Sequence, residues 1–151
     1  MFELWHYQKR ALGQIELAFL RGCRGVFLTI PTGGGKTVIF TDLIRRWVDE
    51  GKHCVVVAHR QELLDQAGKT ILAYGMQHGV IKAGPSTFPL APIQVVSIDS
   101  MRNRELPWYP DVIILDEAHL AKAARYENFL AKYPEAKLLL VSATPIRTDG
   151  S

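Results

Sequence analysis

Residues 26–37 read VFLTIPTGGGKT, and this stretch decides the fold class of the chain. The apolar run Val26 to Ile30 is followed by three glycines and then by a helical pattern that begins near Lys36. A strand, a glycine-rich turn and a helix in this order form the context that a phosphate-binding loop requires. The glycines let backbone N–H groups turn toward one anion, and the helix N-terminus adds its positive dipole. The segment therefore predicts a nucleotide-binding α/β domain.

Each residue type in the loop 31–37 suits a chemical task. Lys36 would reach the β- and γ-phosphates, and the Thr37 hydroxyl would ligate Mg²⁺. The strict pattern has a glycine at position 30, where this chain has Ile30, and the glycines nearer the lysine supply the flexibility instead. We therefore expect ATP and Mg²⁺ as the ligands. The predicted phosphate-binding residues are Gly33, Gly34, Gly35, Lys36 and Thr37.

Apolar runs alternate with helical patterns along the rest of the chain. The expected strands are 26–30, 54–58, 93–98, 112–115 and 138–141. The expected helices are 7–20, 36–50 and 61–74, with a short helical turn at 100–104 and an exposed loop at 83–92. Apolar runs that do not alternate with polar residues are typical of strands buried on both faces. The pattern predicts a mostly parallel sheet with helices on both faces.

Length and composition favour one reduced, soluble domain over residues 1–151. The chain has 18 Lys and Arg against 15 Asp and Glu, a net charge of +3, and 48% hydrophobic residues, so wholesale disorder is excluded. Two cysteines, Cys23 and Cys54, form no disulfide framework, and the spacing offers no zinc site. No signal peptide is evident and no run approaches the ~18 apolar residues of a membrane span. We expect a cytoplasmic protein without a membrane partner.

A second candidate segment, Asp116-Glu117-Ala118-His119, directly follows the apolar strand 112–115. Ligands of open α/β sheets bind at the carboxyl ends of the strands, which is where Asp116 would emerge. Asp116 would act on Mg²⁺ through water, and Glu117 would polarise the attacking water as a general base. The candidate catalytic residues are Lys36, Asp116 and Glu117, and the candidate Mg²⁺ ligands are Thr37 and Asp116.

Together, residues 35–37, 116–119 and 142–144 resemble motifs I, II and III of the superfamily 2 helicases, the DEAD/DEAH-box group. The resemblance implies a RecA-like P-loop NTPase lobe that acts as a nucleic-acid-dependent ATPase. It also implies that the strand before Ser142 lies between the phosphate-loop strand and the Asp116 strand. In that position Ser142 and Thr144 would contact His119 and relay the state of the nucleotide to nucleic acid.

Other segments resemble further parts of the same group. Residues 4–8 are similar to its adenine-reading segment, so the resemblance implies that Tyr7 and Gln8 bind adenine. These two residues could instead simply begin an amphipathic helix. The tail 144–150 is similar to bacterial and phage DNA helicases of the restriction-subunit type, which favours DNA over RNA.

Two segments resemble nucleic-acid-binding motifs. Residues 58–66 look like motif Ia, in which Arg60 would contact a phosphate, although an ordinary solvated helix start is the alternative. Residues 97–101 resemble a strand-binding motif, from which Ser100 is the candidate contact. The implied macromolecular partner is therefore DNA, with RNA possible.

Enzymes of this group hold ATP between two RecA-like lobes, and the second lobe supplies arginines to the phosphoryl group. We expect residues 1–151 to hold the first lobe only, and a second lobe to act in cis or in trans. The isolated chain would then bind Mg–ATP weakly and hydrolyse it very slowly. Two other functions stay open: a nucleotide-binding regulatory module without turnover, and a P-loop kinase. The Glu117 carboxylate beside Asp116 argues against a kinase, which has no water to activate.

Overall fold

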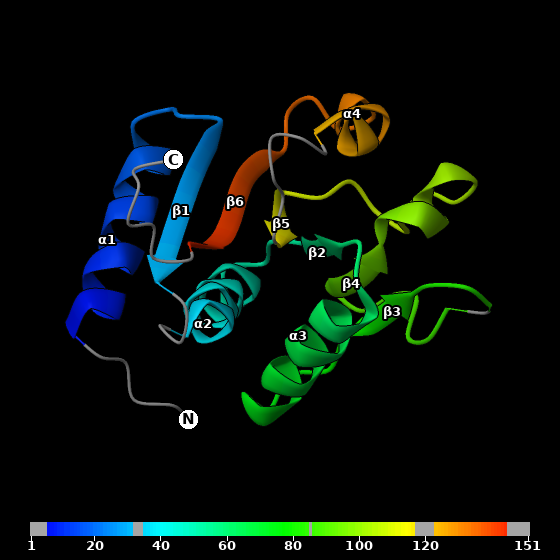
Figure 1. Ribbon diagram of the computed structural model, residues 1–151, viewed down its shortest axis with the longest axis horizontal. Helices are drawn as coiled ribbons and strands as arrows, with labels where there is room; N and C mark the ends of the chain where they lie inside the picture. Colours follow the sequence, from blue (N-terminus) through cyan, green and yellow to red (C-terminus); the bar gives the residue numbers. More distant parts are fainter. Residues whose placement is uncertain (1–5, 32–34, 85, 117–122, 145–151) are drawn as a thin grey trace.

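The computed structural model describes residues 6–31, 35–84, 86–116 and 123–144 (Figure 1). Within these residues six strands form one sheet in the order β1-β6-β5-β2-β4-β3, and every neighbouring pair is parallel. The strands are β1 (Gly25–Pro31), β2 (Cys54–Ala58), β3 (Gly79–Ile81), β4 (Ile93–Ser97), β5 (Val112–Asp116) and β6 (Lys137–Thr144). The predicted parallel α/β sheet is confirmed.

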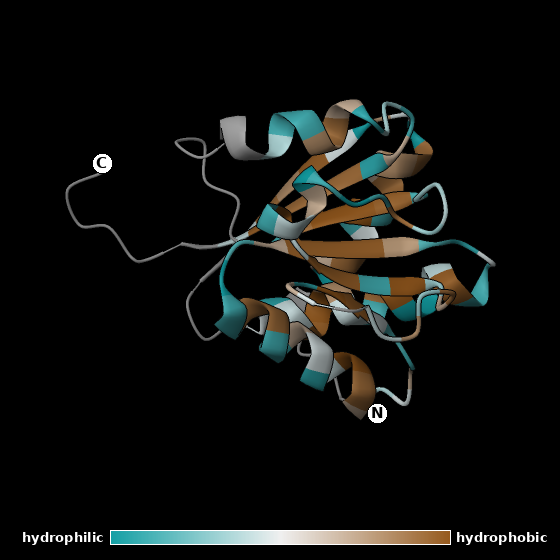
Figure 2. Cartoon of the chain, turned by 90° about the vertical axis from the view of Figure 1, so that its right-hand side faces the viewer, coloured by the Kyte–Doolittle hydropathy of each residue, from teal (hydrophilic) through white to brown (hydrophobic). Residues whose placement is uncertain are grey.

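Helices cover both faces of the sheet, as expected. They are α1 (His6–Leu20), α2 (Lys36–Asp49), α3 (Gln61–Ala73), α4 (Ala123–Ala131) and the 3-10 helix η1 (Ile98–Arg102). Figure 2 shows strands of mostly apolar residues between helices in which polar and apolar residues alternate. None of the helices in these described ranges is long and apolar enough to span a bilayer.

The two faces carry separate hydrophobic clusters because successive strand residues point to opposite sides. On one face, Val56 and Ile114 pack with residues of α1, α2 and α3. On the other face, Val57 and Leu115 pack with Tyr126 of α4 and with residues of η1. Adjacent strand residues therefore serve different cores, which explains why the strands read as continuous apolar runs.

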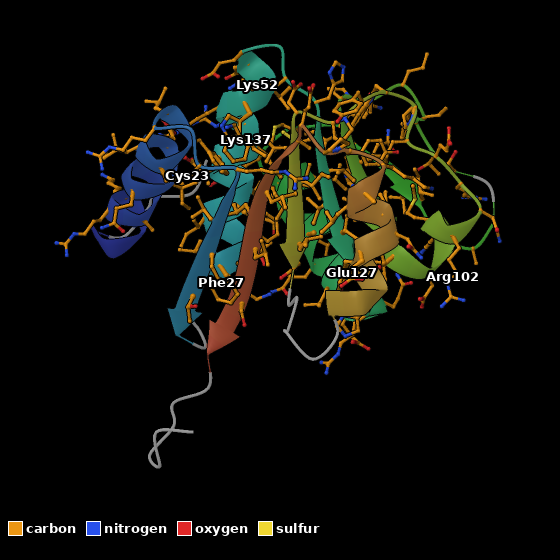
Figure 3. All side chains as sticks on the ribbon, turned by 90° about the horizontal axis from the view of Figure 1, so that it is seen from above. Cys23, Phe27, Lys52, Arg102, Glu127 and Lys137 are labelled. Carbon is orange, nitrogen blue, oxygen red and sulfur yellow. The ribbon has the colours of Figure 1, made fainter. Side chains whose placement is uncertain are left out.

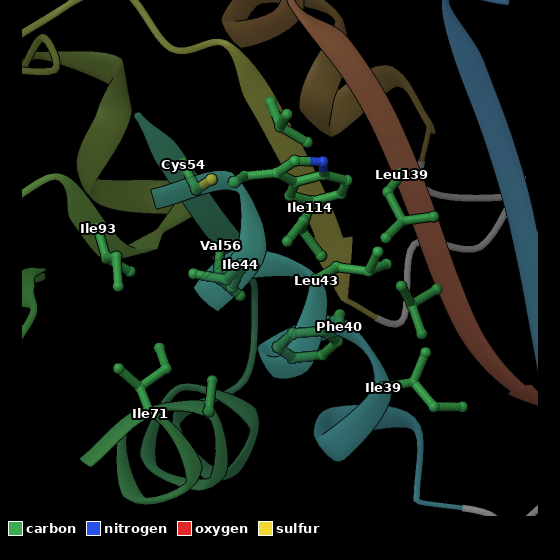
Figure 4. Packing of buried hydrophobic residues seen from close by; sticks show 14 of the residues in the cluster. Ile39, Phe40, Leu43, Ile44, Cys54, Val56, Ile71, Ile93, Ile114 and Leu139 are labelled. Carbon is green, nitrogen blue, oxygen red and sulfur yellow. The ribbon is translucent and has the colours of Figure 1, made fainter. Parts of the chain in front are cut away.

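The helix α2 follows the phosphate loop and is held by a stripe of apolar side chains. Ile39, Phe40, Leu43 and Ile44 are fully buried, and Figure 4 shows them beside β5, β6 and α3. The spacing i, i+1, i+4, i+5 places them on one side of a helix with 3.6 residues per turn. This packing fixes the start of α2 against the carboxyl edge of the sheet.

The strand β6 lies between β1 and β5, which is the arrangement that the family resemblance implied. Ser142 of β6 pairs with Thr29 of β1, and Val141 pairs with Asp116 of β5. Because the three strands are parallel, their carboxyl ends meet at one edge. That edge carries the phosphate loop and the end of β5.

Several boundaries differ from those predicted. The three-residue strand β3 and the helix α4 were not predicted: β3 is too short to show a periodicity, whereas Tyr126, Phe129 and Leu130 of α4 have the i, i+3, i+4 spacing of a helix, a signal that the sequence prediction missed. The strand β6 runs from Lys137 to Thr144 instead of 138–141, because its pairing with β1 continues as far as Pro31. Residues 142–144 are thus part of the strand β6. The 3-10 helix begins at Ile98 instead of Ser100, and β4 ends at Ser97.

The strand β1 corrects the expectation that every apolar run is covered on both faces. It is one of the two edge strands of the described sheet, and Phe27 is 56% exposed. Val26 and Leu28 pack against the cluster that includes residues of α1. Phe27 points to the opposite face of the sheet, and α4, the helix on that face, does not reach over β1 (Figure 3).

Candidate nucleotide-binding site

Two of the predicted site residues meet at the carboxyl edge of the sheet. The Lys36 Nζ donates a hydrogen bond to the Asp116 Oδ1 at 2.5 Å, and the two residues are 80 positions apart in the chain. Lys36 is the first residue of α2 and Asp116 is the last residue of β5. Their side chains are only 13% and 1% exposed. A carboxylate buried this deeply needs a positive partner, and the ammonium group provides one.

The N-terminus of α2 is suited to an anion. Gly35 precedes it with φ +74° and ψ +41°, a left-handed conformation that favours glycine. Helical bonding starts where Ile39 N–H donates to the Gly35 carbonyl oxygen, so the N–H groups of residues 36–38 have no acceptor within the helix. These N–H groups, the helix dipole and the Lys36 ammonium all favour a phosphate. Gly33 and Gly34, the other predicted cradle residues, lie outside the described residues.

The donor atoms near this helix end fit a magnesium ion. The Thr37 hydroxyl is buried, and it hydrogen-bonds to none of the residues that the structure describes. The carboxylate of Asp116, at the end of β5, supplies a second hard oxygen ligand, and β5 is separated from β1 only by β6. Mg²⁺ prefers oxygen ligands and is usually held by one or two carboxylates together with phosphates and water. The residues present therefore fit a Mg²⁺–nucleotide complex.

The predicted coupling residues are only partly described. Ser142 is buried in β6, one position past the residue that pairs with Asp116. Thr144 lies at the end of β6, and its side chain is outside the described part of the structure. Glu117 and His119 also lie outside the described residues. Tyr7 and Gln8 belong to α1, but their side chains are not among those described.

Arg60 and Ser100, the predicted nucleic-acid contacts, follow two other strands of the same sheet. Arg60 is exposed, comes soon after β2 and caps the N-terminus of α3 in an extended conformation. Ser100 is half-buried in η1, which follows β4. Parallel strands end at a common edge, so both residues lie along the edge that carries Asp116.

Sequence reasoning missed one polar contact at this edge. The Tyr126 hydroxyl lies 3.3 Å from the His59 Nδ1, and 67 positions separate the two residues. Tyr126 is 2% exposed, while His59 is half-buried. A contact between residues so far apart in the chain leaves no local sequence pattern. The only available signal is that His59 belongs to the segment that resembles motif Ia.

Comparison with known proteins agrees with this geometry. The family model "Type III restriction enzyme, res subunit" matches residues 1–147. The chain is 28% identical over 121 residues to the "51.5 kDa protein" of Lactococcus phage (isolate 7-9), covering 80% of this chain and 24% of that protein. It is also 28% identical over 155 residues to "Probable helicase HelY" of Mycobacterium tuberculosis, covering 95% of this chain and 17% of that protein. The chain thus spans a quarter or less of these relatives.

The fold is that of a solved helicase lobe. The crystal structure of the UvsW helicase from bacteriophage T4 superposes with a TM-score of 0.72 at 17% identity, covering 94% of this chain and 52% of that chain. This likeness shows the shared fold, and the family model adds the sequence relationship. The chain therefore belongs to the type III restriction enzyme, res subunit, family and forms an N-terminal RecA-like lobe of the superfamily 2 helicase type.

Proposed function

We propose that residues 1–151 form one domain, the ATP-binding motor lobe of an ATP-dependent helicase or translocase that acts on DNA. The observation that carries this proposal is the contact between Lys36 and Asp116, which joins the two segments that resemble motifs I and II. In the proposed site Lys36 binds the β- and γ-phosphates, with Gly33, Gly34 and Gly35 around them. Thr37 and Asp116 hold Mg²⁺, and Tyr7 and Gln8 bind adenine.

The proposed chemistry assigns a task to each polar group. Bound Mg²⁺ would neutralise charge on the phosphates. Glu117 would accept a proton from the attacking water, and Lys36 would stabilise negative charge on the γ-phosphate. Ser142 and Thr144 would contact His119 and transmit the state of the nucleotide. Arg60 and Ser100 would bind the DNA backbone.

The Lys36–Asp116 ion pair makes nucleotide and metal depend on each other. A phosphate that attracts the ammonium takes the positive partner away from a carboxylate that is only 1% exposed. A Mg²⁺ ion held by Asp116 would restore positive charge beside this buried carboxylate. We therefore expect nucleotide to bind much more weakly when Mg²⁺ is removed with a chelator.

The second lobe is a proposed partner in cis or in trans. Where it has been measured in related chemistry, an arginine supplied to the γ-phosphate is worth about 10³–10⁵ in turnover. The 151-residue chain alone is therefore expected to bind Mg–ATP and to hydrolyse it very slowly, with or without DNA.

The test is a titration of a fluorescent ATP analogue in the presence of Mg²⁺ with the wild type, Lys36→Ala and Lys69→Ala. Lys69 is an exposed lysine of α3 and serves as the control for a simple loss of charge. We expect Lys36→Ala to bind at least about 10-fold more weakly, because it loses a charge-assisted contact to phosphate, and Lys69→Ala to bind like the wild type. Equal affinities of all three proteins would refute the proposal.

A further inference from the structure

We propose that Tyr126 is a positioning residue: its hydrogen bond to His59 couples the nucleotide site to the turn that carries Arg60. The inference rests on the function proposed above. It concerns the pair formed by the Tyr126 hydroxyl and the His59 Nδ1, which lie 3.3 Å apart.

The contact joins the chain that leaves β5 to the chain that leaves β2. These strands are neighbours in the sheet, and Leu115 pairs with Val57 close to their carboxyl ends. Past Asp116 the chain continues to α4, which carries Tyr126 near its start. Past Ala58 the chain continues directly to His59 and Arg60. One hydrogen bond therefore connects the segment after the proposed Mg²⁺ ligand to the residue before the proposed DNA contact.

The burial of Tyr126 makes this connection stiff. Its ring belongs to the cluster that includes Val57 and Leu115, and the residue is 2% exposed. A hydrogen bond made by a buried hydroxyl is more costly to lose than one made in water, which favours a fixed contact. If the start of α4 shifts, either His59 follows or the bond breaks. Because consecutive Cα atoms are fixed about 3.8 Å apart, a shift of His59 also moves Arg60.

Packing alone does not require the hydroxyl, because a phenylalanine ring would fill the same place in the cluster. Tyr133 offers a matched comparison in that cluster. Its hydroxyl accepts a hydrogen bond from the Leu106 backbone N–H at 3.4 Å. The Tyr133 carbonyl accepts from the Ala136 N–H, just before β6 begins, so this residue lies toward the opposite edge of the sheet. Tyr133→Phe thus removes the same atom without touching the proposed connection.

The experiment measures how much DNA changes the affinity for nucleotide. The dissociation constant of a fluorescent, non-hydrolysable ATP analogue with Mg²⁺ is measured with and without a saturating single-stranded oligodeoxynucleotide. The ratio of the two constants is the coupling factor, and linkage requires that nucleotide changes DNA affinity by the same factor. For the wild type we expect a factor well away from one.

Loss of the hydroxyl is expected to bring this factor closer to one. A net hydrogen bond corresponds to about a 2- to 10-fold change in an equilibrium, so Tyr126→Phe should reduce the factor by that amount. Its affinity for nucleotide without DNA should stay within about 2-fold of the wild type. Tyr133→Phe should keep the wild-type factor.

A pair of substitutions at the partner position separates coupling from folding. His59→Leu removes the polar group. In His59→Asn the amide oxygen and nitrogen are bonded to Cγ, as Nδ1 is in histidine, so the amide can still hydrogen-bond to the Tyr126 hydroxyl. We expect the leucine variant to behave like Tyr126→Phe and the asparagine variant to recover most of the factor. Since His59 is half-buried, these variants keep the test available if Tyr126→Phe does not fold.

Three results would overturn the inference: a wild-type factor of one, an unchanged factor in both Tyr126→Phe and His59→Leu, or an equal loss in Tyr133→Phe. All three can occur while nucleotide and DNA still bind, so they leave the proposed function standing. Failure of the wild type to bind the analogue at all would instead refute the proposed function, and this inference with it.

Discussion

The Lys36 ammonium and the Asp116 carboxylate lie 2.5 Å apart, although β6 separates β5, which ends at Asp116, from β1, the strand that precedes α2 in the chain. Neighbouring strands are about 4.8 Å apart, so β1 and β5 are separated by about 10 Å at their carboxyl ends. The lysine crosses this gap from the first turn of α2. β6 occupies the space between these two strands, and its Ser142 comes one position after the residue that pairs with Asp116.

The substitution Thr37→Val tests the proposed magnesium ligand. Valine keeps the shape of the side chain, and the Thr37 hydroxyl bonds to none of the described residues. We expect the free energy of unfolding to change by less than about 1 kcal/mol and nucleotide affinity with Mg²⁺ to fall about 10-fold. With a chelator present, the variant and the wild type should bind equally.

Thr41→Val is the matched control, because the Thr41 hydroxyl is also buried without a partner among the described residues, one turn further along α2. Its nucleotide affinity should match the wild type. Equal losses in both variants would show that the effect is not one of metal ligation.

The substitution Arg60→Gln tests the proposed DNA contact. Each phosphate contact adds about one to the slope of log affinity against log salt. We expect the variant to bind single-stranded DNA more weakly at low salt and with a slope smaller by about one, measured by fluorescence anisotropy. Arg10→Gln, at an exposed position of α1, should leave the slope unchanged. An unchanged slope in Arg60→Gln would contradict the assignment.

The buried His78 makes stability depend on pH. Desolvation lowers its pKa in the folded chain below the ordinary 6.5, so the folded state holds this imidazole neutral. Below about pH 6.5 the imidazole of His78 is protonated in the unfolded state but stays neutral in the folded state. The contribution of His78 to the free energy of unfolding is therefore fully present above that pH, and it is lost as the pH falls through the pKa of the folded chain.

Urea unfolding at about pH 7.5 and pH 5.5 measures this effect. We expect the free energy of unfolding to fall less for His78→Gln than for the wild type on acidification, since the other histidines are common to both. An equal fall in the two proteins would remove His78 as the cause.

The two cysteines should differ in reactivity. Burial, with a further effect of Asp111, raises the pKa of the Cys54 thiol to about 12, so its thiolate is scarce at neutral pH. Cys23 is exposed in the turn between α1 and β1 (Figure 3). A disulfide reagent such as DTNB should titrate Cys23 at once and Cys54 only after denaturation. Rapid reaction of both thiols in the native chain would contradict the burial of Cys54.

The sequence predicted those parts of the fold in which local pattern and tertiary packing agree. The start of α2 was predictable because glycines precede Lys36, and Gly35 indeed has a positive φ. Its buried face was predictable because its apolar residues recur at helical spacing. The strand β3 could not be predicted, because three residues carry too little periodicity and their pairing with β4 is a tertiary effect. The exposed Phe27 was missed because an apolar run does not show whether its strand lies at an edge of the sheet.

The candidate site divides in the same way. Spacing from a strand end predicted that Asp116 would reach the carboxyl edge, and the structure brings it to Lys36. The contact between His59 and Tyr126 depends on the register of β2 against β5, which single-sequence patterns do not contain.

The most direct test of the account is a crystal structure of the chain with Mg²⁺ and a non-hydrolysable ATP analogue. We expect the Lys36 ammonium to contact the β- and γ-phosphate oxygens, and Mg²⁺ to lie beside the Thr37 hydroxyl and the Asp116 carboxylate. A nucleotide bound at another surface, with the Lys36–Asp116 ion pair still intact, would contradict it.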